Sequence, residues 1–181
     1  MKSFHNDINV KRKYVARTEA HRKADEIIRG TGWDGKRGCA VGCTLECYNH
    51  AQYPIELGIP EWLAHVEDTL FGGISADRAM FWPSEFLLAV PVGVTERQFE
   101  VNVKAPFLVL VLESALETFD NEKFPNVTNA IRGSIELWLS ADIGSDDWKK
   151  AAWAAEAVAE AVEKHDYFAD ELLRLLKGSN K

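Results

Sequence analysis

The sequence contains no apolar run long enough to cross a lipid bilayer. Its longest, residues 107–112, falls far short of the ~20 apolar residues that a membrane-spanning helix needs. Residues 1–13 contain no apolar stretch, so the sequence predicts no signal peptide. An excess of positive charge is also lacking, because 28 Asp and Glu outnumber 21 Lys and Arg and give a net charge of −7. A protein that binds the phosphate backbone needs a basic face, so this charge argues against a nucleic-acid partner.

Cysteine is scarce. The three cysteines, Cys39, Cys43 and Cys47, are crowded into one short segment, whereas a secreted disulfide-bonded protein spreads an even number along its chain. The pattern predicts reduced thiols in a cytoplasmic protein. We expect no membrane association and no cofactor.

Strand patterns are rare as well. Only residues 99–103 alternate strictly between apolar and polar side chains, and a single strand has no partner for its backbone. We therefore interpret this stretch as helical or irregular. With 181 residues, 46% of them hydrophobic and 27% charged, the chain predicts one globular all-α domain over residues 1–181. We expect a bundle of six to eight helices.

Local signals place the first helices. Asp7 or Asn9 can cap a helix that runs to about Arg29, where glycines end it. Asn49 can cap a short helix that ends near Gly58. The predicted apolar stripe of the first helix consists of Ala16, Ala20, Ala24 and Ile27.

A further helix is expected from Pro60 to about Phe71. Its predicted buried stripe consists of Ile59, Leu63, Val66 and Leu70. The other face carries Glu61, His65 and Asp68, which could form a general base or bind a metal but which we interpret as a solvated face. Later helices are expected over residues 75–81, 83–90, 106–119 and 124–139, with Phe81, Trp82, Phe86, Leu87, Ile131, Ile135 and Trp138 in the core.

The C-terminal helix is predicted to be long. Ser145 can cap it, and it runs to about Lys177 with Gly178 as its stop. Its apolar seam steps by three and four residues through Trp148, Ala151, Ala155, Val158, Val162, His165, Ala169, Leu172 and Leu176. We interpret this helix as the spine of the bundle. Alternatively, its alanine-rich first half packs on a second copy of the chain or on a protein partner.

Residues 30–50 hold the least ordinary composition in the chain: five of the twelve glycines and every cysteine. Glycine permits positive φ and close backbone approach, so residues 30–42 are expected to be irregular. The segment could bind an anion or nucleotide through free N–H groups, two cations and an aromatic ring, although it matches no known phosphate-binding motif. The candidate ligand-binding residues are Trp33, Lys36, Arg37, Gly38, Gly42 and Thr44. We favour the alternative, a tight buried turn whose small residues let two helices pack closely.

The cysteines allow two chemical interpretations. If residues 39–47 are helical, the three thiols share one stripe and cannot all face a single tetrahedral ion, so we predict no metal site. A nucleophilic Cys39 or Cys43, with His50 or His21 as its base, would make the chain a thiol-dependent enzyme. Against this stands the commoner role of free cysteine as a small buried hydrophobe.

Several motifs occur together. The segment GKRGCAVGCTL at 35–45 is followed by ELGIPEWLAHVED at 56–68, FGG at 71–73 and WPSEFL at 82–87. Together they resemble a family of small bacterial and phage-encoded proteins, and the resemblance covers most of the chain. It implies that residues 38–44 form a shared site and that the chain comes from a mobile element. It implies no established activity.

Three functions follow from these observations. We place first a non-enzymatic interaction protein, such as a phage-borne inhibitor or accessory factor that acts on a host protein, because the chain is acidic and lacks a coherent catalytic set. A protein partner or self-association through the C-terminal helix would suit this function. The second is a small-ligand or nucleotide-binding protein that uses residues 30–44, and the third is the thiol-dependent enzyme.

Overall fold

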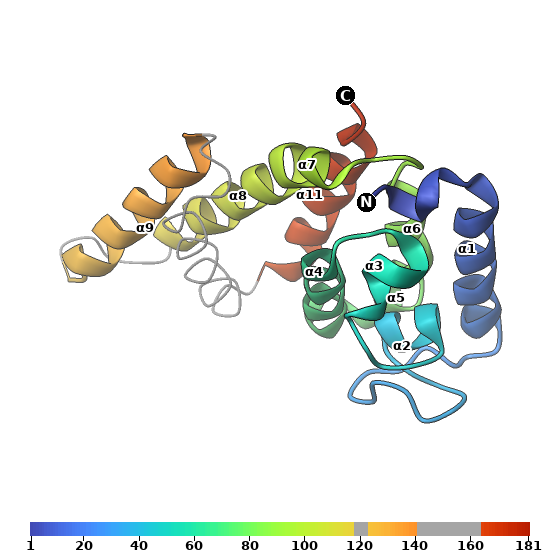
Figure 1. Cartoon of the computed structure of the whole chain (residues 1–181). Coiled ribbons are helices and arrows are strands. Elements are labelled where there is room, and N and C mark those ends of the chain that lie inside the picture. Colours follow the sequence, from blue (N-terminus) through green and yellow to red (C-terminus); the bar gives the residue numbers. More distant parts are fainter. Residues whose placement is uncertain (118–122, 141–163) are drawn as a thin grey trace. The chain divides into compact units, whose positions relative to one another are not determined.

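The computed structural model describes residues 1–117, 123–140 and 164–181 (Figure 1). Within these ranges every regular element is a helix, which confirms the all-α prediction. None of the helices described there is both long enough and apolar enough to span a membrane. Contacts divide the chain into two compact units, Met1–Phe99 with His165–Lys181 (unit 1) and Glu100–Lys164 (unit 2). The prediction that residues 1–181 form one domain stays a prediction.

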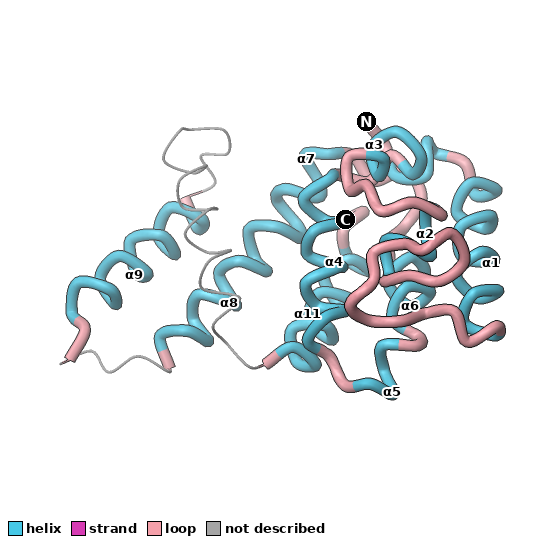
Figure 2. The backbone as a smooth tube through the Cα atoms, turned by 90° about the horizontal axis from the view of Figure 1, so that it is seen from below, coloured by secondary structure: helices cyan, strands magenta, loops and turns pink. Residues whose placement is uncertain are grey.

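Unit 1 is built from short helices. They are η1 (Ser3–Asn6), α1 (Ile8–Lys23), α2 (Ala40–Leu45), α3 (Gln52–Leu57), α4 (Glu61–Gly73), α5 (Ala76–Ala79), α6 (Trp82–Ala89), α7 (Glu96–Phe99) and α11 (His165–Gly178). The tube in Figure 2 shows how the loops on either side of α2 wind over the face made by α1, α4 and α6. Helix α11 packs against both α4 and α6, so the two ends of the chain close one unit.

Helix α1 begins as predicted and ends early. Asp7 caps it by accepting a hydrogen bond from the Asn9 backbone N–H at 2.7 Å. The helix stops at Lys23 instead of running to Arg29, because Asp25 takes a left-handed conformation with φ of 57°. Of the predicted stripe, Ile27 is buried as predicted, although it lies beyond the end of the helix, and the three alanines are wrong. The residues that α1 buries are Tyr14, Thr18 and His21, whereas Ala16, Ala20 and Ala24 are exposed.

The middle helices follow part of their local signals. Helix α3 ends just before Gly58, as predicted, and Gly58 takes a left-handed conformation with φ of 62°. Its N-cap is Ala51 and not the predicted Asn49, whose side chain accepts from the Ala51 backbone N–H at 3.2 Å. Pro60 stands just before α4 instead of inside it. On the buried stripe of α4, Leu63 and Leu70 are confirmed, and Val66 is only half-buried.

The interior of unit 1 centres on α6 and α11. Trp82, Phe86 and Leu87 are buried as predicted, but Phe81 is 47% exposed. Phe81 is the N-cap residue of α6 and stands before the helix whose side chains fill the core. From α11 the buried residues are Phe168, Ala169, Leu172 and Leu176. The last three confirm the end of the predicted seam, and its first part, at 145–163, lies outside the described residues.

Unit 2 contains η2 (Glu100–Lys104), α8 (Ala105–Leu116) and α9 (Pro125–Leu139). Residues 100–104 form a π-type helical turn, which confirms that the alternating pattern is not a strand. Helix α8 starts one residue before Pro106, and position 119, where its end was predicted, lies outside the described residues. The core between α8 and α9 consists of Leu108, Leu112, Ile131 and Trp138, with Ile135 packed against it.

Candidate functional site

The glycines of the central segment bring the loop backbone onto α2. The Gly32 carbonyl accepts from the Cys39 backbone N–H at 3.1 Å. A Cβ atom on Gly42 would lie 1.8 Å from that carbonyl oxygen, and one on Gly38 would lie 2.4 Å from it. Close approach therefore requires glycine at 38 and 42. Helices α1, α4 and α6 all pack against α2, but the group that comes closest to Gly38 and Gly42 is the loop carbonyl of Gly32. Gly42 is helical, although irregularity was predicted.

The six predicted ligand-binding residues do not share one surface. Arg37 Nη2 pairs with Asp34 Oδ2 at 3.1 Å, and Lys36 Nζ pairs with Glu26 Oε1 at 3.4 Å. Both cations are thus already next to carboxylates. Trp33 is half-buried, with its ring edge-on to an imidazole, and Gly38, Gly42 and Thr44 are buried. The anion or nucleotide site stays a prediction, and this arrangement does not favour it.

The cysteines do not form the predicted single stripe. Cys39 caps α2, with its Sγ accepting from the Gly42 N–H at 3.5 Å, and Cys43 lies inside the helix. Cys47 falls beyond Glu46, whose φ of 56° ends the helix. Burial raises the pKa of both Cys39 and Cys43 to about 12, so these thiols are protonated at neutral pH. Across the described ranges, no three His, Cys, Asp or Glu side chains are grouped so as to hold a metal ion.

The candidate base His21 is engaged on the other side of α2. Its Nδ1 lies 2.8 Å from Glu26 Oε2, and the Cys43 thiol donates to the Glu26 carbonyl at 3.7 Å. Arg17 and Glu46 pair nearby at 3.3 Å. This partly buried network joins α1, the loop and α2. Cys43, which is fully buried, and His21 lie in it together. The role of His21 as a base stays a prediction.

A second polar cluster gathers around Asp68 of α4. Its Oδ2 accepts from the Tyr48 hydroxyl at 2.8 Å and lies 3.2 Å from His50 Nε2. Asp68 is also one of the groups that raise the pKa of the Cys39 thiol, after burial. The ring of His65, one turn earlier on α4, stacks on His50 with centroids 4.1 Å apart and planes 8° apart. We call Cys39, Tyr48, His50, His65 and Asp68 the Asp68 cluster.

The Asp68 cluster is partly open to solvent. The side chains of His50 and Asp68 are 13% and 18% exposed, whereas His65 and Tyr48 lie at the surface. Asp68 is therefore not part of a purely solvated face, as the sequence was interpreted, although Glu61 and His65 are exposed. The loop glycines help to build the cluster, since a Cβ on Gly32 would lie 2.4 Å from the Tyr48 ring. The Tyr48 ring thus packs directly against the Gly32 backbone.

The environment sets the charge states in the cluster. Burial and the adjacent His65 ring lower the pKa of His50, and Asp68 opposes that shift. The hydrogen bond to Asp68 raises the pKa of Tyr48 to about 12. At neutral pH the cluster therefore holds a neutral imidazole, a neutral phenol and a neutral thiol around one carboxylate. Such an arrangement can accept and donate protons.

Two residues that sequence reasoning missed lie directly behind the cluster. Glu67 and Tyr53 are completely buried, and the Tyr53 hydroxyl donates to Glu67 Oε2. Burial raises the pKa of Glu67 well above its usual range, which favours the neutral form of its carboxyl group. One signal could have revealed it, because Glu67 stands four residues after Leu63 and three before Leu70, on the apolar stripe of α4.

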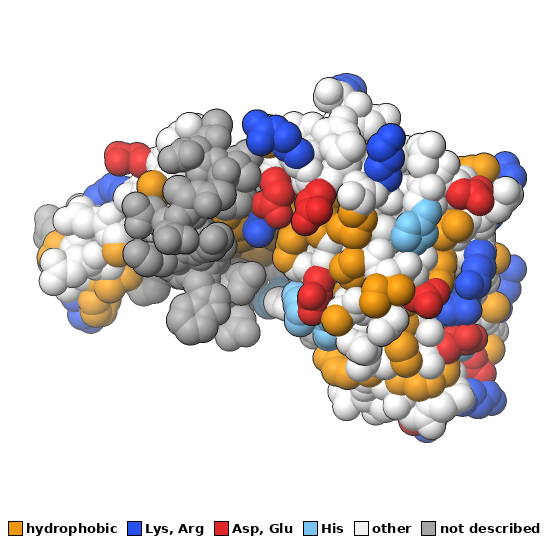
Figure 3. Space-filling model, in the orientation of Figure 1, with side chains coloured by type: hydrophobic (Ala, Val, Ile, Leu, Met, Phe, Trp, Pro, Cys, Tyr) orange, Lys and Arg blue, Asp and Glu red, His pale blue; other side chains and the backbone are white. Residues whose placement is uncertain are grey.

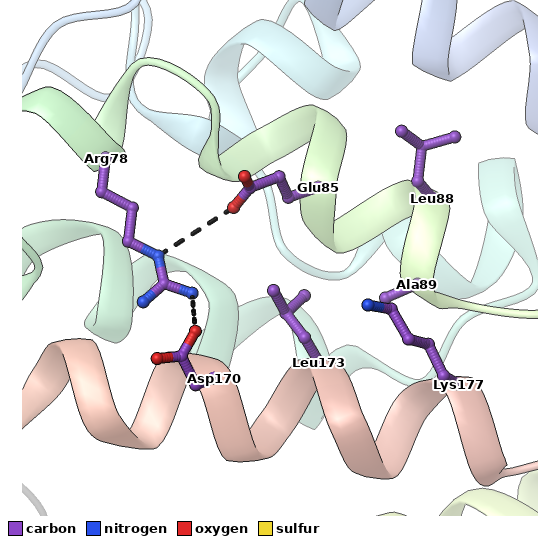
Figure 4. A pocket seen from close by; sticks show the side chains of 7 residues that line it. All are labelled: Arg78, Glu85, Leu88, Ala89, Asp170, Leu173 and Lys177. Atoms are coloured by element: carbon purple, nitrogen blue, oxygen red, sulfur yellow. Dashed lines mark hydrogen bonds and ion pairs between the residues drawn. The ribbon is translucent and has the colours of Figure 1, made fainter.

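A pocket of about 560 Å³ lies between α6 and α11 (Figure 4). Its walls include Leu88, Ala89 and Leu173, and charged groups stand at its ends. Arg78 Nη2 pairs with Asp170 Oδ1 at 2.7 Å, and its Nη1 donates to the Asp166 carbonyl at 2.9 Å. The guanidinium is thus used to attach α11, which leaves it no free face for an anion.

No known protein family, curated protein or solved structure matches the chain. The class that the fold and the cluster define is an all-helical protein with an imidazole–carboxylate site. The family resemblance noted from the motifs stays a prediction.

Proposed function

We propose that this chain is a hydrolase in which His50 is the general base and Asp68 orients it. The observation that carries the proposal is the sharing of Asp68 Oδ2 between the Tyr48 hydroxyl at 2.8 Å and His50 Nε2 at 3.2 Å. A carboxylate bonded to one ring nitrogen fixes the imidazole tautomer. It also stabilises the imidazolium ion that forms when the other nitrogen takes a proton.

The geometry assigns each atom of the pair a role. His50 Nε2 carries the proton that it donates to Asp68, so the lone pair of Nδ1 is free to accept a proton from water. The lowered pKa of His50 favours the neutral ring at pH 7, so this lone pair is not already protonated. The water activated in this way attacks an ester or amide carbonyl, and the imidazolium returns the proton to the leaving group.

The thiol is a poorer candidate for the reacting group. Cys39 is 6% exposed, and its pKa of about 12 leaves almost no thiolate at neutral pH. Its sulfur instead accepts from the Gly42 backbone N–H at 3.5 Å and caps α2. We therefore assign the base chemistry to the imidazole. The thiol-dependent enzyme stays a prediction with this geometry against it.

The charge of the cluster limits the substrate. The Asp68 cluster contains no Lys or Arg, and the only other charged group paired within it is Glu61, beside His65. Over the face of unit 1 seen in Figure 3, acidic and basic side chains are interspersed, without a basic field that would draw in anions. We propose a neutral or cationic substrate.

Hydrolysis of p-nitrophenyl acetate by the full-length chain, compared with free imidazole at equal concentration, tests the proposal. We expect His50→Gln to lower the protein-catalysed rate about 100-fold or more and Asp68→Asn to lower it about tenfold. His5→Gln is the matched control, because His5 bonds the Ile55 carbonyl outside the cluster, and it should leave the rate unchanged. A wild-type rate equal to that of free imidazole, or an unaffected His50→Gln variant, would overturn the proposal.

This proposal differs from the interaction protein that we placed first from the sequence. That function, whether as a phage-borne inhibitor or as an accessory factor, stays a prediction, because the helix that would carry the contact lies largely at 145–163, outside the described residues. Affinity capture from a bacterial lysate, with sedimentation analysis of the purified chain, tests it. A monomer recovered without any partner would leave the interaction hypothesis without support.

A further inference from the structure

Two links run side by side between the turn that begins α3 and the middle of α4. The outer link joins His50 to Asp68 at 3.2 Å. The inner link joins Tyr53 to Glu67 and is completely buried. The two links are also joined to each other at both ends, by the chain on α4 and by a backbone hydrogen bond on the other side. Glu67 and Asp68 are consecutive, and the Tyr53 backbone N–H donates to the His50 carbonyl at 3.0 Å.

The inner link is also anchored from behind. Trp82 Nε1 of α6 donates to the Glu67 backbone carbonyl at 3.0 Å, and the Trp82 ring is fully buried. The turn of α4 that carries Asp68 is thus fixed by α3 on one side and α6 on the other. A displacement of this turn by one residue would rotate Asp68 by about 100° and carry its carboxylate away from His50.

We propose that Glu67 and Tyr53 are positioning residues for the Asp68 cluster. Their buried hydrogen bond sets the register between the 50–53 turn and α4, and so holds Asp68 Oδ2 against His50 Nε2. This inference rests on the proposed function for its purpose, but not for its test.

The chemical form of Glu67 makes the inference selective. Because burial raises the pKa of Glu67 and favours its neutral form, glutamine is a neutral isostere for this carboxyl group. Glutamine retains the carbonyl oxygen that accepts from Tyr53, whereas leucine fills the space without any hydrogen bond. If Glu67 only fills space in the core, both glutamine and leucine should preserve the position of Asp68. If Glu67 positions Asp68 through its hydrogen bond, only glutamine should preserve it.

The tautomer of His50, read from imidazole 15N chemical shifts of the full-length chain at pH 7.5, tests the inference. We expect the Nε2–H form in the wild type and in Glu67→Gln, and a mixture of both tautomers in Glu67→Leu. Tyr53→Phe, which removes one oxygen atom and keeps the ring, should give the same mixture, and it keeps the inference testable if Glu67→Leu does not fold. Ser84→Ala is the control, since Ser84 is also buried on α6 and its hydroxyl donates to the Phe81 carbonyl at 3.3 Å, outside the cluster.

The outcomes separate this inference from the proposed function. An unchanged His50 tautomer in Tyr53→Phe, or equal disturbance in Glu67→Gln and Glu67→Leu, would overturn the positioning role. A tautomer that responds as expected in a protein that never hydrolyses p-nitrophenyl acetate would leave the positioning role standing and remove the hydrolase. If both hold, Tyr53→Phe should also lower the hydrolysis rate about tenfold.

Discussion

At the scale of single residues, the three cysteines differ in how far water reaches them. Cys39 and Cys43 are buried, and burial raises the pKa of each to about 12, whereas Cys47 is only half-buried. We expect iodoacetamide at pH 8 to label Cys47 first, with Cys39 and Cys43 at least about 100-fold slower, since each pKa unit costs a factor of ten in thiolate. Mass spectrometry of time-resolved peptides measures the order. Fastest labelling at Cys39 would contradict the prediction and favour a thiol-dependent enzyme.

Asp68 and His65 act in opposite directions on His50. Burial and His65 lower the pKa of His50, whereas Asp68 raises it. We therefore expect the pKa of His50 to fall further in Asp68→Asn and to rise in His65→Gln, as measured by NMR titration of the imidazole protons. Equal and unchanged midpoints in both variants would mean that neither ring nor carboxylate is close to His50 in solution.

The raised pKa of the buried Glu67 carboxyl group makes stability depend on pH. In the unfolded chain this carboxyl loses its proton near its ordinary value of 4.5, but in the folded chain it keeps it to a much higher pH. The folded state thus binds more protons above pH 4.5, and its stability falls as pH rises toward the folded pKa. Glu67→Gln removes this loss. Calorimetry should show a variant whose Tm is close to that of the wild type at pH 4 and higher at pH 7.5, by about 2–4 °C per kcal/mol. If the Tm of the wild type and the Tm of Glu67→Gln change with pH in the same way, the raised pKa of Glu67 is contradicted.

At the scale of elements, two helical glycines differ in what surrounds them. A Cβ on Gly42 would lie 1.8 Å from the Gly32 carbonyl oxygen, whereas one on Gly72 of α4 would meet nothing within 4 Å. We expect Gly42→Ala to lower the free energy of unfolding by about 2 kcal/mol or more through overpacking. Gly72→Ala, the matched control, should raise it by about 0.5–1 kcal/mol through helix propensity. Urea denaturation measures both, and a neutral Gly42→Ala would show that the loop does not pack on α2.

Helix ends with local signals could be predicted from the sequence, and ends decided by distant contacts could not. Gly58 ends α3 because its own backbone favours a left-handed cap. The end of α1 depends on pairing with the glycine loop, in which the Ile28 N–H donates to the Gly38 carbonyl at 2.8 Å. The two residues of this contact are ten apart in the sequence, so the periodicity of a helix cannot predict it. The helical spacing predicted for the buried side of α1 was right, but the wrong side of the helix was chosen. Tyr14, and not the alanines, fills the interior of unit 1.

The site could be predicted in parts only. The sequence singled out Cys39 and His50, and separately the trio that includes Asp68, because these residue types carry chemistry. It could not join them, since Asp68 reaches His50 only through the packing of α4 against the segment around α2 and α3. Tyr48 was missed because its position depends on the bare backbone of Gly32.

At the scale of the whole molecule, each unit has a core of its own. In unit 1 the C-terminal helix α11 closes a core begun by the N-terminal half, with Leu172 fully buried against α4 and α6. In unit 2, Leu112 belongs to the cluster between α8 and α9. The sequence predicted a single bundle because its apolar periods run through both units without a linker.

Truncating one leucine in each core distinguishes two cooperative units from one. We expect Leu172→Ala and Leu112→Ala each to cost about 2–5 kcal/mol, because both remove a buried isobutyl group. Amide hydrogen exchange followed by mass spectrometry should show faster exchange in α4 and α6 for Leu172→Ala, and in α9 for Leu112→Ala, with the other unit unchanged. If either variant speeds exchange equally across α4, α6 and α9, the chain unfolds as one cooperative domain, and the single domain predicted from the sequence is correct.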